Sequence, residues 1–285
     1  MTTLLILGAD GQVGRELQRV HPVDWSAFYA ARAEADLSDP AACARIVDLA
    51  EASLVINAAA YTAVDRAEED EELARTVNAH APGAIARACA DRGIPFLHIS
   101  TDYVFNGMGA KPFSPDDPTS PINAYGRTKL AGERAVLAAG GNSLILRTSW
   151  VFSAHGNNFV KTMLRLGHER DAISVVDDQI GGPTSARSIA RALITCAEAM
   201  LRGQRGGIYQ FAGRPDVSWA GFAGEIMRQA GLDCRVDKIA TADYPTPARR
   251  PANSRMDCSA IERDFGVKCP DWRADLAEVI TELNQ

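Results

Sequence analysis

The sequence lacks any cysteine arrangement that would hold a metal ion or a disulfide framework. No Cys-x-x-Cys pair occurs, and no cysteine lies beside a pair of histidines. Scattered cysteines of this kind exclude an ordinary zinc site and are typical of free thiols in a reducing compartment. The six cysteines are Cys43, Cys89, Cys196, Cys234, Cys258 and Cys269.

Long hydrophobic runs and an excess of positive charge are also missing. The apolar run at residues 4–7 is too short for a signal-peptide core or a membrane span, and no basic segment precedes it. The 285 residues carry 30 Lys and Arg against 36 Asp and Glu, a net charge of −6, which excludes a basic surface for nucleic acid. We therefore expect a cytoplasmic protein with no membrane or nucleic-acid partner.

What the sequence does have, at its start, is a strand followed by a glycine-rich turn. Residues 3–7 are continuously apolar, as expected for a strand buried on both faces of a parallel sheet. Gly8, Gly11 and Gly14 follow and let the backbone approach a pyrophosphate, whose charge is stabilised by the first amides of a helix over 12–20. The G-x-x-G-x-x-G spacing differs from the commoner G-x-G-x-x-G, so a plain strand-turn-helix stays open.

The residue that ends the second expected strand bears on the choice of dinucleotide. This strand, over residues 27–31, is followed by Arg32, where a carboxylate would be expected if the site bound a free ribose 2′-hydroxyl. A guanidinium suits a 2′-phosphate better, which favours NADPH over NADH. Glu34 and Asp36 follow closely, so NADH stays open.

Two further strands bring polar and small residues to the same edge of the sheet. Residues 54–56 lead into the small residues of 57–62, which leave room for a flat ligand, and residues 95–99 lead into Thr101. A helix over 71–92 separates the two strands. Because right-handed crossovers place the carboxyl ends of parallel strands together, we expect Thr101 beside the glycine turn.

Tyr125 and Lys129 complete the candidate site. Residues four apart lie on one face of a helix, so the ammonium can sit beneath the phenol and favour phenolate. Thr101 would then orient a carbonyl oxygen that Tyr125 protonates. Tyr-x-x-x-Lys also occurs by chance in many helices, and a partly buried Tyr beside a solvated Lys is the alternative.

Several of these motifs together resemble a known family. Gly8, Gly11 and Gly14, residues 57–60, Ser100-Thr101-Asp102 and Tyr125-x-x-x-Lys129 are similar to those of extended short-chain dehydrogenases/reductases. Within that family, longer segments across nearly the whole chain resemble the dTDP-4-dehydrorhamnose reductases. These segments are residues 100–105, 123–133, 147–152, 156–159, 178–184 and 249–254.

The resemblance implies an activity and a role for each matching residue. It implies NAD(P)H-dependent reduction of the 4-keto group of dTDP-4-dehydro-6-deoxy-L-mannose to dTDP-L-rhamnose, the last step in making that sugar donor. Tyr125 would donate the proton, Lys129 would be its partner, and Thr101 would bind the keto oxygen. The residues expected to bind substrate are Thr101, Asp102, Trp150, Asn158 and Arg250. The residues expected to bind the dinucleotide follow from the glycine turn, from Arg32 and from the resemblance. They are Gly8, Gly11, Gln12, Val13, Gly14, Arg32, Asp36, Leu37, Ala60, Tyr61, Thr62, Tyr125 and Lys129.

In one place the sequence departs from the family. Some members are dimers bridged by magnesium on glutamates from two helices; Glu16 matches the first position, but Arg187 occupies the second. A guanidinium cannot ligate a cation, so we expect no metal site. A monomer, or a dimer without a metal bridge, is expected instead.

The expected architecture is an α/β fold with two domains. A Rossmann-like, doubly wound parallel sheet over residues 1–149, with about 189–213 returning, would bind the NAD(P). A smaller mixed α/β domain, about 150–188 and 214–285, would bind the nucleotide sugar. Helices are expected over 219–230 and 272–283, and residues 107–121, rich in Gly and Pro, should form a mobile loop.

Two other functions fit the same fold. A nucleotide-sugar dehydratase or epimerase shares it, but the dehydratase pattern needs an acidic residue where Tyr103 stands. A non-catalytic, NADP-binding regulatory subunit is the second alternative. The presence of Thr101, Tyr125 and Lys129 argues against that one.

Overall fold

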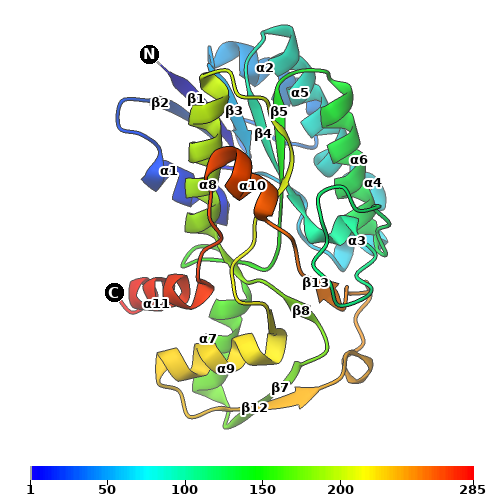
Figure 1. The fold of residues 1–285 in the computed structure, drawn as a ribbon, viewed down its shortest axis with the longest axis vertical. Helices are drawn as coiled ribbons and strands as arrows, with labels where there is room; N and C mark the ends of the chain where they lie inside the picture. The colour runs from blue at the N-terminus through cyan, green and yellow to red at the C-terminus, as the bar shows by residue number, and fades with distance from the viewer. Residues whose placement is uncertain (1) are drawn as a thin grey trace.

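A six-stranded parallel sheet organises the protein, whose computed structural model describes residues 2–285 (Figure 1). The strand order β10-β5-β4-β3-β1-β2 reverses direction between β1 and β3, which is the doubly wound topology. All five neighbouring pairs are parallel. The predicted Rossmann-like fold is therefore confirmed. The strands are β1 Thr3–Leu7, β2 Ser26–Ala30, β3 Leu54–Asn57, β4 Phe96–Thr101, β5 Ser143–Thr148 and β10 Gly207–Gln210.

Helices cover both faces of this sheet. On one face α1 packs against α8, and on the other α5 packs between α2 and α6 (Figure 1). Leu4 and Ile6 point to the first layer while Leu5 and Leu7 point to the second, so β1 is apolar on both sides. The helices are α1 Gln12–Val20, α2 Pro40–Leu49, α5 Ala81–Asp91, α6 Ala124–Ala138 and α8 Ala186–Leu201.

The helix expected over residues 71–92 has the predicted extent but is not uniform. It consists of α4 Glu71–Arg75, a π-helical turn η1 Thr76–His80, and α5, and a short helix α3 Arg66–Glu69 precedes it. Pro82 has no backbone N–H, so the carbonyl of Asn78 has no donor four residues later. A π-helical turn accommodates this break without ending the helix.

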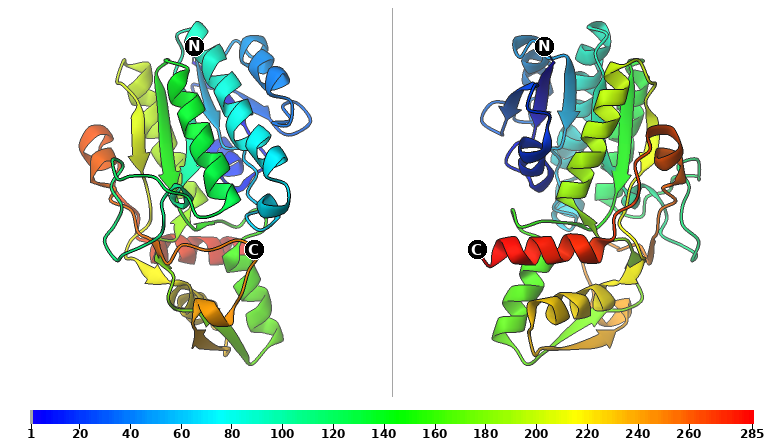
Figure 2. Two further views of the ribbon diagram at one scale, coloured as in Figure 1. Left: turned by 90° about the vertical axis from the view of Figure 1, so that its right-hand side faces the viewer. Right: turned by 60° about the vertical axis from the view of Figure 1, so that its left-hand side comes forward.

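The remaining residues form a second body with its own apolar core, beyond the carboxyl edge of the sheet (Figure 2). Helix α9 lies at its centre, against α7, α11 and the pair β7–β12. The predicted helices over 219–230 and 272–283 are confirmed as α9 and α11. Its elements are β6 Val151–Phe152, α7 Phe159–Glu169, β7 Ala172–Val176, β8 Ile180–Gly181, β9 Thr184–Ser185, β11 Val217–Ser218, α9 Trp219–Ala230, β12 Arg235–Ile239, η3 Thr241–Asp243, β13 Asn253–Ser254 and α11 Trp272–Leu283.

Helix α10, Ser259–Phe265, departs from this grouping. It lies within the 214–285 stretch expected in the smaller domain, yet it packs on α8 and β10 and shares their apolar core. Met256 and Ile261 are both fully buried there. The chain therefore returns to the sheet once more before α11.

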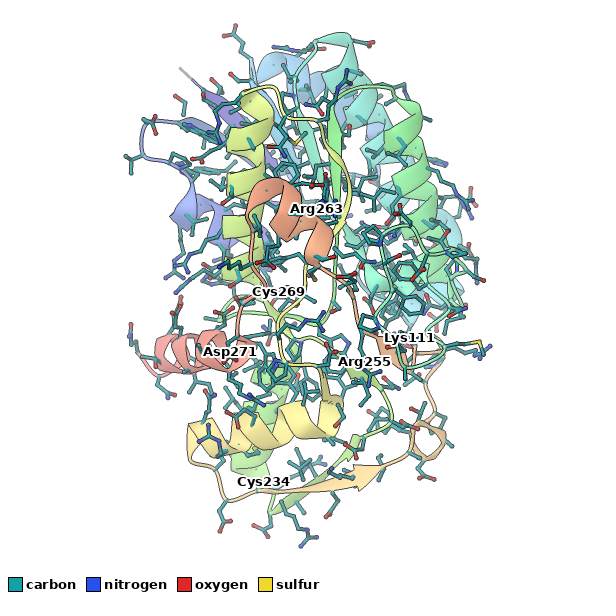
Figure 3. The ribbon with its side chains drawn as sticks, in the orientation of Figure 1. Lys111, Cys234, Arg255, Arg263, Cys269 and Asp271 are labelled. Carbon is teal, nitrogen blue, oxygen red and sulfur yellow. The ribbon has the colours of Figure 1, made fainter. Side chains whose placement is uncertain are left out.

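The loop of residues 107–121 is bonded to the segment that begins with β13. The Phe113 amide donates to the Arg255 carbonyl at 2.9 Å, and the Asp257 amide donates to the Phe113 carbonyl at 2.8 Å. The Asn253 side chain donates to the Lys111 carbonyl at 2.8 Å. Lys111 and Arg255 mark this junction in Figure 3. Mobility of the loop stays a prediction.

Within residues 2–285, no helix has both the length and the apolar character that crossing a membrane requires.

Candidate active site

The glycine turn between β1 and α1 has no room for side chains. Gly8 has a φ of +82°, and a Cβ on Gly14 would lie 2.1 Å from the Gly8 carbonyl oxygen. Gly11 precedes the first helical residue, Gln12, so the unpaired amides of the first turn open directly beside the turn. This cradle, which any Cβ would fill, fits the pyrophosphate of a dinucleotide.

The other residues expected to bind the dinucleotide lie along the same edge. Arg32 follows β2, has a side chain 81% exposed, and bonds Asp36 at 3.1 Å. Leu37 is buried nearby. After β3, residues 60–62 pass the site, and the Asn78 side chain holds the Tyr61 backbone at both its amide, 2.9 Å, and its carbonyl, 3.1 Å.

Thr101, Tyr125 and Lys129 come together beside this edge. Thr101 ends β4, which lies next to β3, and the other two lie on α6. Gly126 lets α6 approach closely, because a Cβ there would lie 2.2 Å from the Tyr103 carbonyl oxygen. The rings of Tyr103 and Tyr125 meet edge to face with centroids 5.5 Å apart.

The phenol of Tyr125 is held in its protonated form. Burial raises its pKa above the ordinary value, and Asp102 and Tyr103 raise it further. The Thr101 hydroxyl lies close enough to lower the pKa, but burial outweighs it. The effect expected of the Lys129 charge, which would favour phenolate, stays a prediction.

Lys129 faces the sheet. Its Nζ donates to the Ile99 carbonyl at 2.7 Å and lies 3.4 Å from His98 Nε2. Burial lowers the pKa of Lys129 to about 8, while Glu133, one turn further along α6, acts in the opposite direction. The amine therefore changes charge close to neutral pH.

Asp102 offers a buried acceptor at the end of β4. Its Oδ1 accepts from the Thr101 hydroxyl at 3.1 Å, and no partner among residues 2–285 satisfies Oδ2. Burial raises the pKa of Asp102 to about 6, against the opposing effect of the Ser254 and Thr101 hydroxyls. An unsatisfied buried oxygen of this kind is suited to a ligand hydroxyl.

We expect Asp102 to make the protein less stable as the pH rises from about 4 to about 6. Its carboxyl has a folded-state pKa of about 6 against a reference value of 3.8, so over this range the folded state holds a proton that the unfolded state has lost. The loss approaches about 3 kcal/mol, at about 1.4 kcal/mol per pKa unit. Asp102→Asn should abolish this slope in urea titrations at each pH, and an unchanged slope would contradict it.

Three residues expected to bind substrate stack on, or bond to, other residues of the protein. Trp150, with a φ of +49°, stacks on Trp219 with ring centroids 3.6 Å apart. Asn158 caps α7 and its amide donates to Gln12 Oε1 at 3.0 Å. Arg250 pairs with Asp65 at 2.6 Å. Their contact with substrate stays a prediction.

Comparison with known proteins places the chain in a family. The model of the RmlD substrate binding domain matches residues 1–285. The chain belongs to the RmlD substrate binding domain family. A dTDP-4-dehydrorhamnose reductase from Burkholderia thailandensis is 45% identical over 293 residues, which cover 98% of each chain.

Solved structures support the same assignment to the RmlD substrate binding domain family. A dTDP-4-dehydrorhamnose reductase from Clostridium acetobutylicum matches with a TM-score of 0.94 and 36% identity, covering 100% of both chains. Another from Bacillus anthracis, in complex with NADP, matches with a TM-score of 0.91 and 32% identity, covering 99% of this chain and 100% of that one. The predicted resemblance is confirmed.

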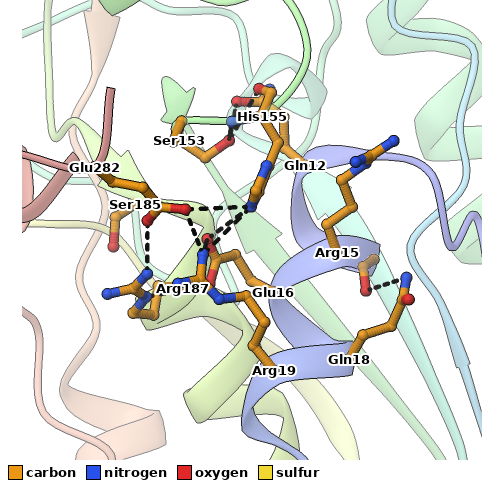
Figure 4. Close-up of polar contacts among 12 residues, drawn as sticks. Gln12, Arg15, Glu16, Gln18, Arg19, Ser153, His155, Ser185, Arg187 and Glu282 are labelled. Carbon is orange, nitrogen blue, oxygen red and sulfur yellow. Dashed lines mark hydrogen bonds and ion pairs between the residues drawn. The ribbon is translucent and has the colours of Figure 1, made fainter. Parts of the chain in front are cut away.

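In this member of the RmlD substrate binding domain family, a guanidinium lies among the carboxylates next to α1 (Figure 4). Arg187 bonds Glu16 at 3.1 Å, Glu278 at 3.0 Å and Glu282 at 2.9 Å. Arg19 bonds Glu282 from the other side at 2.6 Å. A divalent cation does not fit this donor set, because the guanidinium already occupies the space between the carboxylates.

Sequence reasoning assigned no role to several residues that hold the site. Asn123 caps α6, accepting from the Gly126 amide at 2.8 Å and donating to the Arg249 carbonyl at 2.8 Å. An Asn directly before an expected helix is a capping signal, so this one was detectable. No comparable signal marks Asn57 and His98, which form a buried contact 41 residues apart.

Proposed function

We propose that the chain reduces the 4-keto group of dTDP-4-dehydro-6-deoxy-L-mannose with NADPH to give dTDP-L-rhamnose, the last step in making that donor. The observation that carries this proposal is the convergence of Thr101, Tyr125 and Lys129 at the end of β4, on the sheet edge that also carries the glycine turn. The names of the relatives, dTDP-4-dehydrorhamnose reductases at up to 45% identity, support the substrate.

Each side chain has a defined part in the reaction. The reduced nicotinamide supplies the hydride for the sugar C4. Tyr125, protonated through its raised pKa, donates the proton that turns the developing oxyanion into a hydroxyl. With substrate bound, the Thr101 hydroxyl turns its one proton from Asp102 Oδ1 to the same oxygen, and Asp102 accepts from a sugar hydroxyl instead.

The cofactor is NADPH, with NADH as the second candidate. Arg32 supports this choice, because the residue after β2 meets the 2′ position of the adenosine ribose in folds of this kind. The guanidinium of Arg32 is largely exposed there and suits a 2′-phosphate. The bond to Asp36 leaves its remaining N–H groups for a 2′-phosphate. The Bacillus anthracis relative in complex with NADP supports the same cofactor.

One assay tests the function. Absorbance of NADPH should fall when the protein is mixed with dTDP-4-dehydro-6-deoxy-L-mannose, and the rate with NADH should be lower. A regulatory subunit would leave the absorbance unchanged, and a dehydratase or epimerase would convert a nucleotide sugar without net consumption of NADPH. Tyr103, packed on Tyr125 where a dehydratase needs an acid, favours the reductase.

The domain that binds the nucleotide sugar consists of residues 150–188 and 214–285 apart from α10.

No magnesium ion bridges two copies of the protein. The bonds of Arg187 to Glu16, Glu278 and Glu282 support the absence of this metal bridge. After gentle purification, metal analysis should find no stoichiometric magnesium, and light scattering should give a monomer or a metal-independent dimer. Stoichiometric magnesium in a dimer that chelator dissociates would contradict this proposal.

A further inference from the structure

A chain of buried polar groups runs from β3 through β4 to Lys129. The Ala59 amide donates to Asn57 Oδ1 at 3.0 Å, and Asn57 Nδ2 lies 3.2 Å from His98 Nδ1. His98 Nε2 in turn lies 3.4 Å from Lys129 Nζ. Asn57, His98 and Lys129 are all at most 1% exposed, so solvent does not supply alternative partners.

The direction of this chain is fixed at its start. An amide N–H only donates, so Ala59 fixes the Asn57 oxygen on its own side and the NH₂ group on the side of His98. His98 Nδ1 must then accept from Asn57. A neutral imidazole that accepts at Nδ1 carries its proton on Nε2, and Nε2 faces Lys129.

We propose that His98 is a positioning residue for the reduction: Asn57 holds its imidazole as the Nε2–H tautomer, and this N–H faces the Lys129 amino group and favours its neutral form. The inference rests on the proposed function and assigns a further residue to the same site. A neutral amine accepts from His98 and donates to the Ile99 carbonyl, so both contacts are satisfied. A Lys129 ammonium has no lone pair, so one of its N–H groups would face the Nε2–H of His98 with no acceptor between them.

The charged groups around Lys129 do not cancel the preference for its neutral form. On α6, Glu133 lies one turn from Lys129 and favours the ammonium, but its carboxylate is paired with Arg147 on β5. Among the described residues, Glu133 is the charged group that acts on the amine and His98 is the titratable group that the amine acts on. Tyr125 lies one turn before Lys129 on α6. Burial lowers the pKa of both Lys129 and His98.

The consequence for the reaction is a lysine that changes charge in the working range of pH. An amine with an ordinary pKa of about 10.4 stays protonated throughout turnover. Once Tyr125 has given up its proton, Lys129 in its ammonium form can pass a proton to the phenolate and become the neutral amine, which takes up a proton from solvent before the next turnover. His98 contributes by donating its Nε2–H to the neutral amine, which keeps Lys129 Nζ within hydrogen-bond distance of the Ile99 carbonyl.

The test is NMR of the whole protein without substrate. In the wild type, long-range proton–nitrogen spectra of ¹⁵N-histidine protein should show His98 with its proton on Nε2, the signal being assigned by its loss in His98→Phe. Asn57→Asp should reverse the tautomer, because a carboxylate accepts from both Ala59 and His98 Nδ1. The titration midpoint of Lys129 Nζ, assigned by its loss in Lys129→Met, should then rise by about one pH unit.

Asn106→Asp is the matched control. Asn106 uses its oxygen to accept from the Met108 amide at 2.9 Å, a bond that Asp retains, and it directly precedes the loop of residues 107–121. Its Lys129 midpoint should equal that of the wild type. In assays with NADPH and the dTDP sugar, the alkaline limb of kcat/KM should shift upward in Asn57→Asp alone.

A wild-type His98 with its proton on Nδ1 would overturn the proposal, even if Asn57→Asp fails to fold. An unchanged Lys129 midpoint in a folded Asn57→Asp protein with the reversed tautomer would also overturn it. Neither result needs substrate, so both leave the proposed reduction standing. If the wild type did not consume NADPH, the proposed reduction would be contradicted. The NMR result for the His98 tautomer would still stand, because it is measured without substrate.

Discussion

Replacing Tyr125 by Phe should lower kcat about 10²–10⁴-fold, the range that a positioned general acid contributes. The phenol is the group whose pKa burial holds above its ordinary value, so the wild type offers a proton at neutral pH. Phe keeps the ring that packs against Tyr103 and removes only the hydroxyl. Folding and binding of NADPH should therefore be unchanged, as thermal melts and fluorescence titration would show.

Tyr103→Phe is the matched control for this experiment. Tyr103 lies beside Tyr125 with ring centroids 5.5 Å apart and is itself largely buried, so the same atom is removed next to the same site. Its turnover should stay within about tenfold of the wild type, since its hydroxyl bonds Arg250 and has no part in the proposed proton transfer. Near-normal turnover in Tyr125→Phe would remove the phenol from its role.

The elements around the site were predictable where local signals were strong. The helices expected over 12–20, 219–230 and 272–283 match α1, α9 and α11. Ser218 and Asp271 cap the last two through their side chains, and Gly11 opens the first, so each boundary is marked within the sequence itself. Continuous apolar runs predicted the buried strands for the same reason.

The parts that could not be predicted depend on residues far apart in the chain. No local pattern indicates that Asn158 bonds Gln12, 146 residues away, or that Arg250 pairs with Asp65. The burial that raises the pKa of Tyr125 was not predictable either, because it depends on packing that no local pattern encodes. Spacing predicted which groups meet, but not how deeply they are buried.

The largest stability effect should come from a buried ion pair that supports α6. Arg147 on β5 donates to Glu133 through Nε at 2.9 Å and a terminal nitrogen at 2.7 Å, and the side chains are 3% and 2% exposed. Ser100 also donates to Glu133, and Arg147 donates to the Pro115 carbonyl at 3.1 Å. The pair thus joins the helix that carries Tyr125 to the sheet and to the loop of residues 107–121.

Arg147→Met should therefore destabilise the protein by about 3–5 kcal/mol, because it leaves the Glu133 carboxylate buried without a counter-charge. Urea denaturation measures the loss. The double variant Glu133→Met/Arg147→Met should recover part of it, since two apolar side chains leave no unpaired charge, and its effect should be smaller than the sum of the two single changes. Strict additivity, or a single variant within about 1 kcal/mol of the wild type, would mean that α6 is held by its apolar contacts alone and that the pair contributes little to fixing Tyr125 and Lys129.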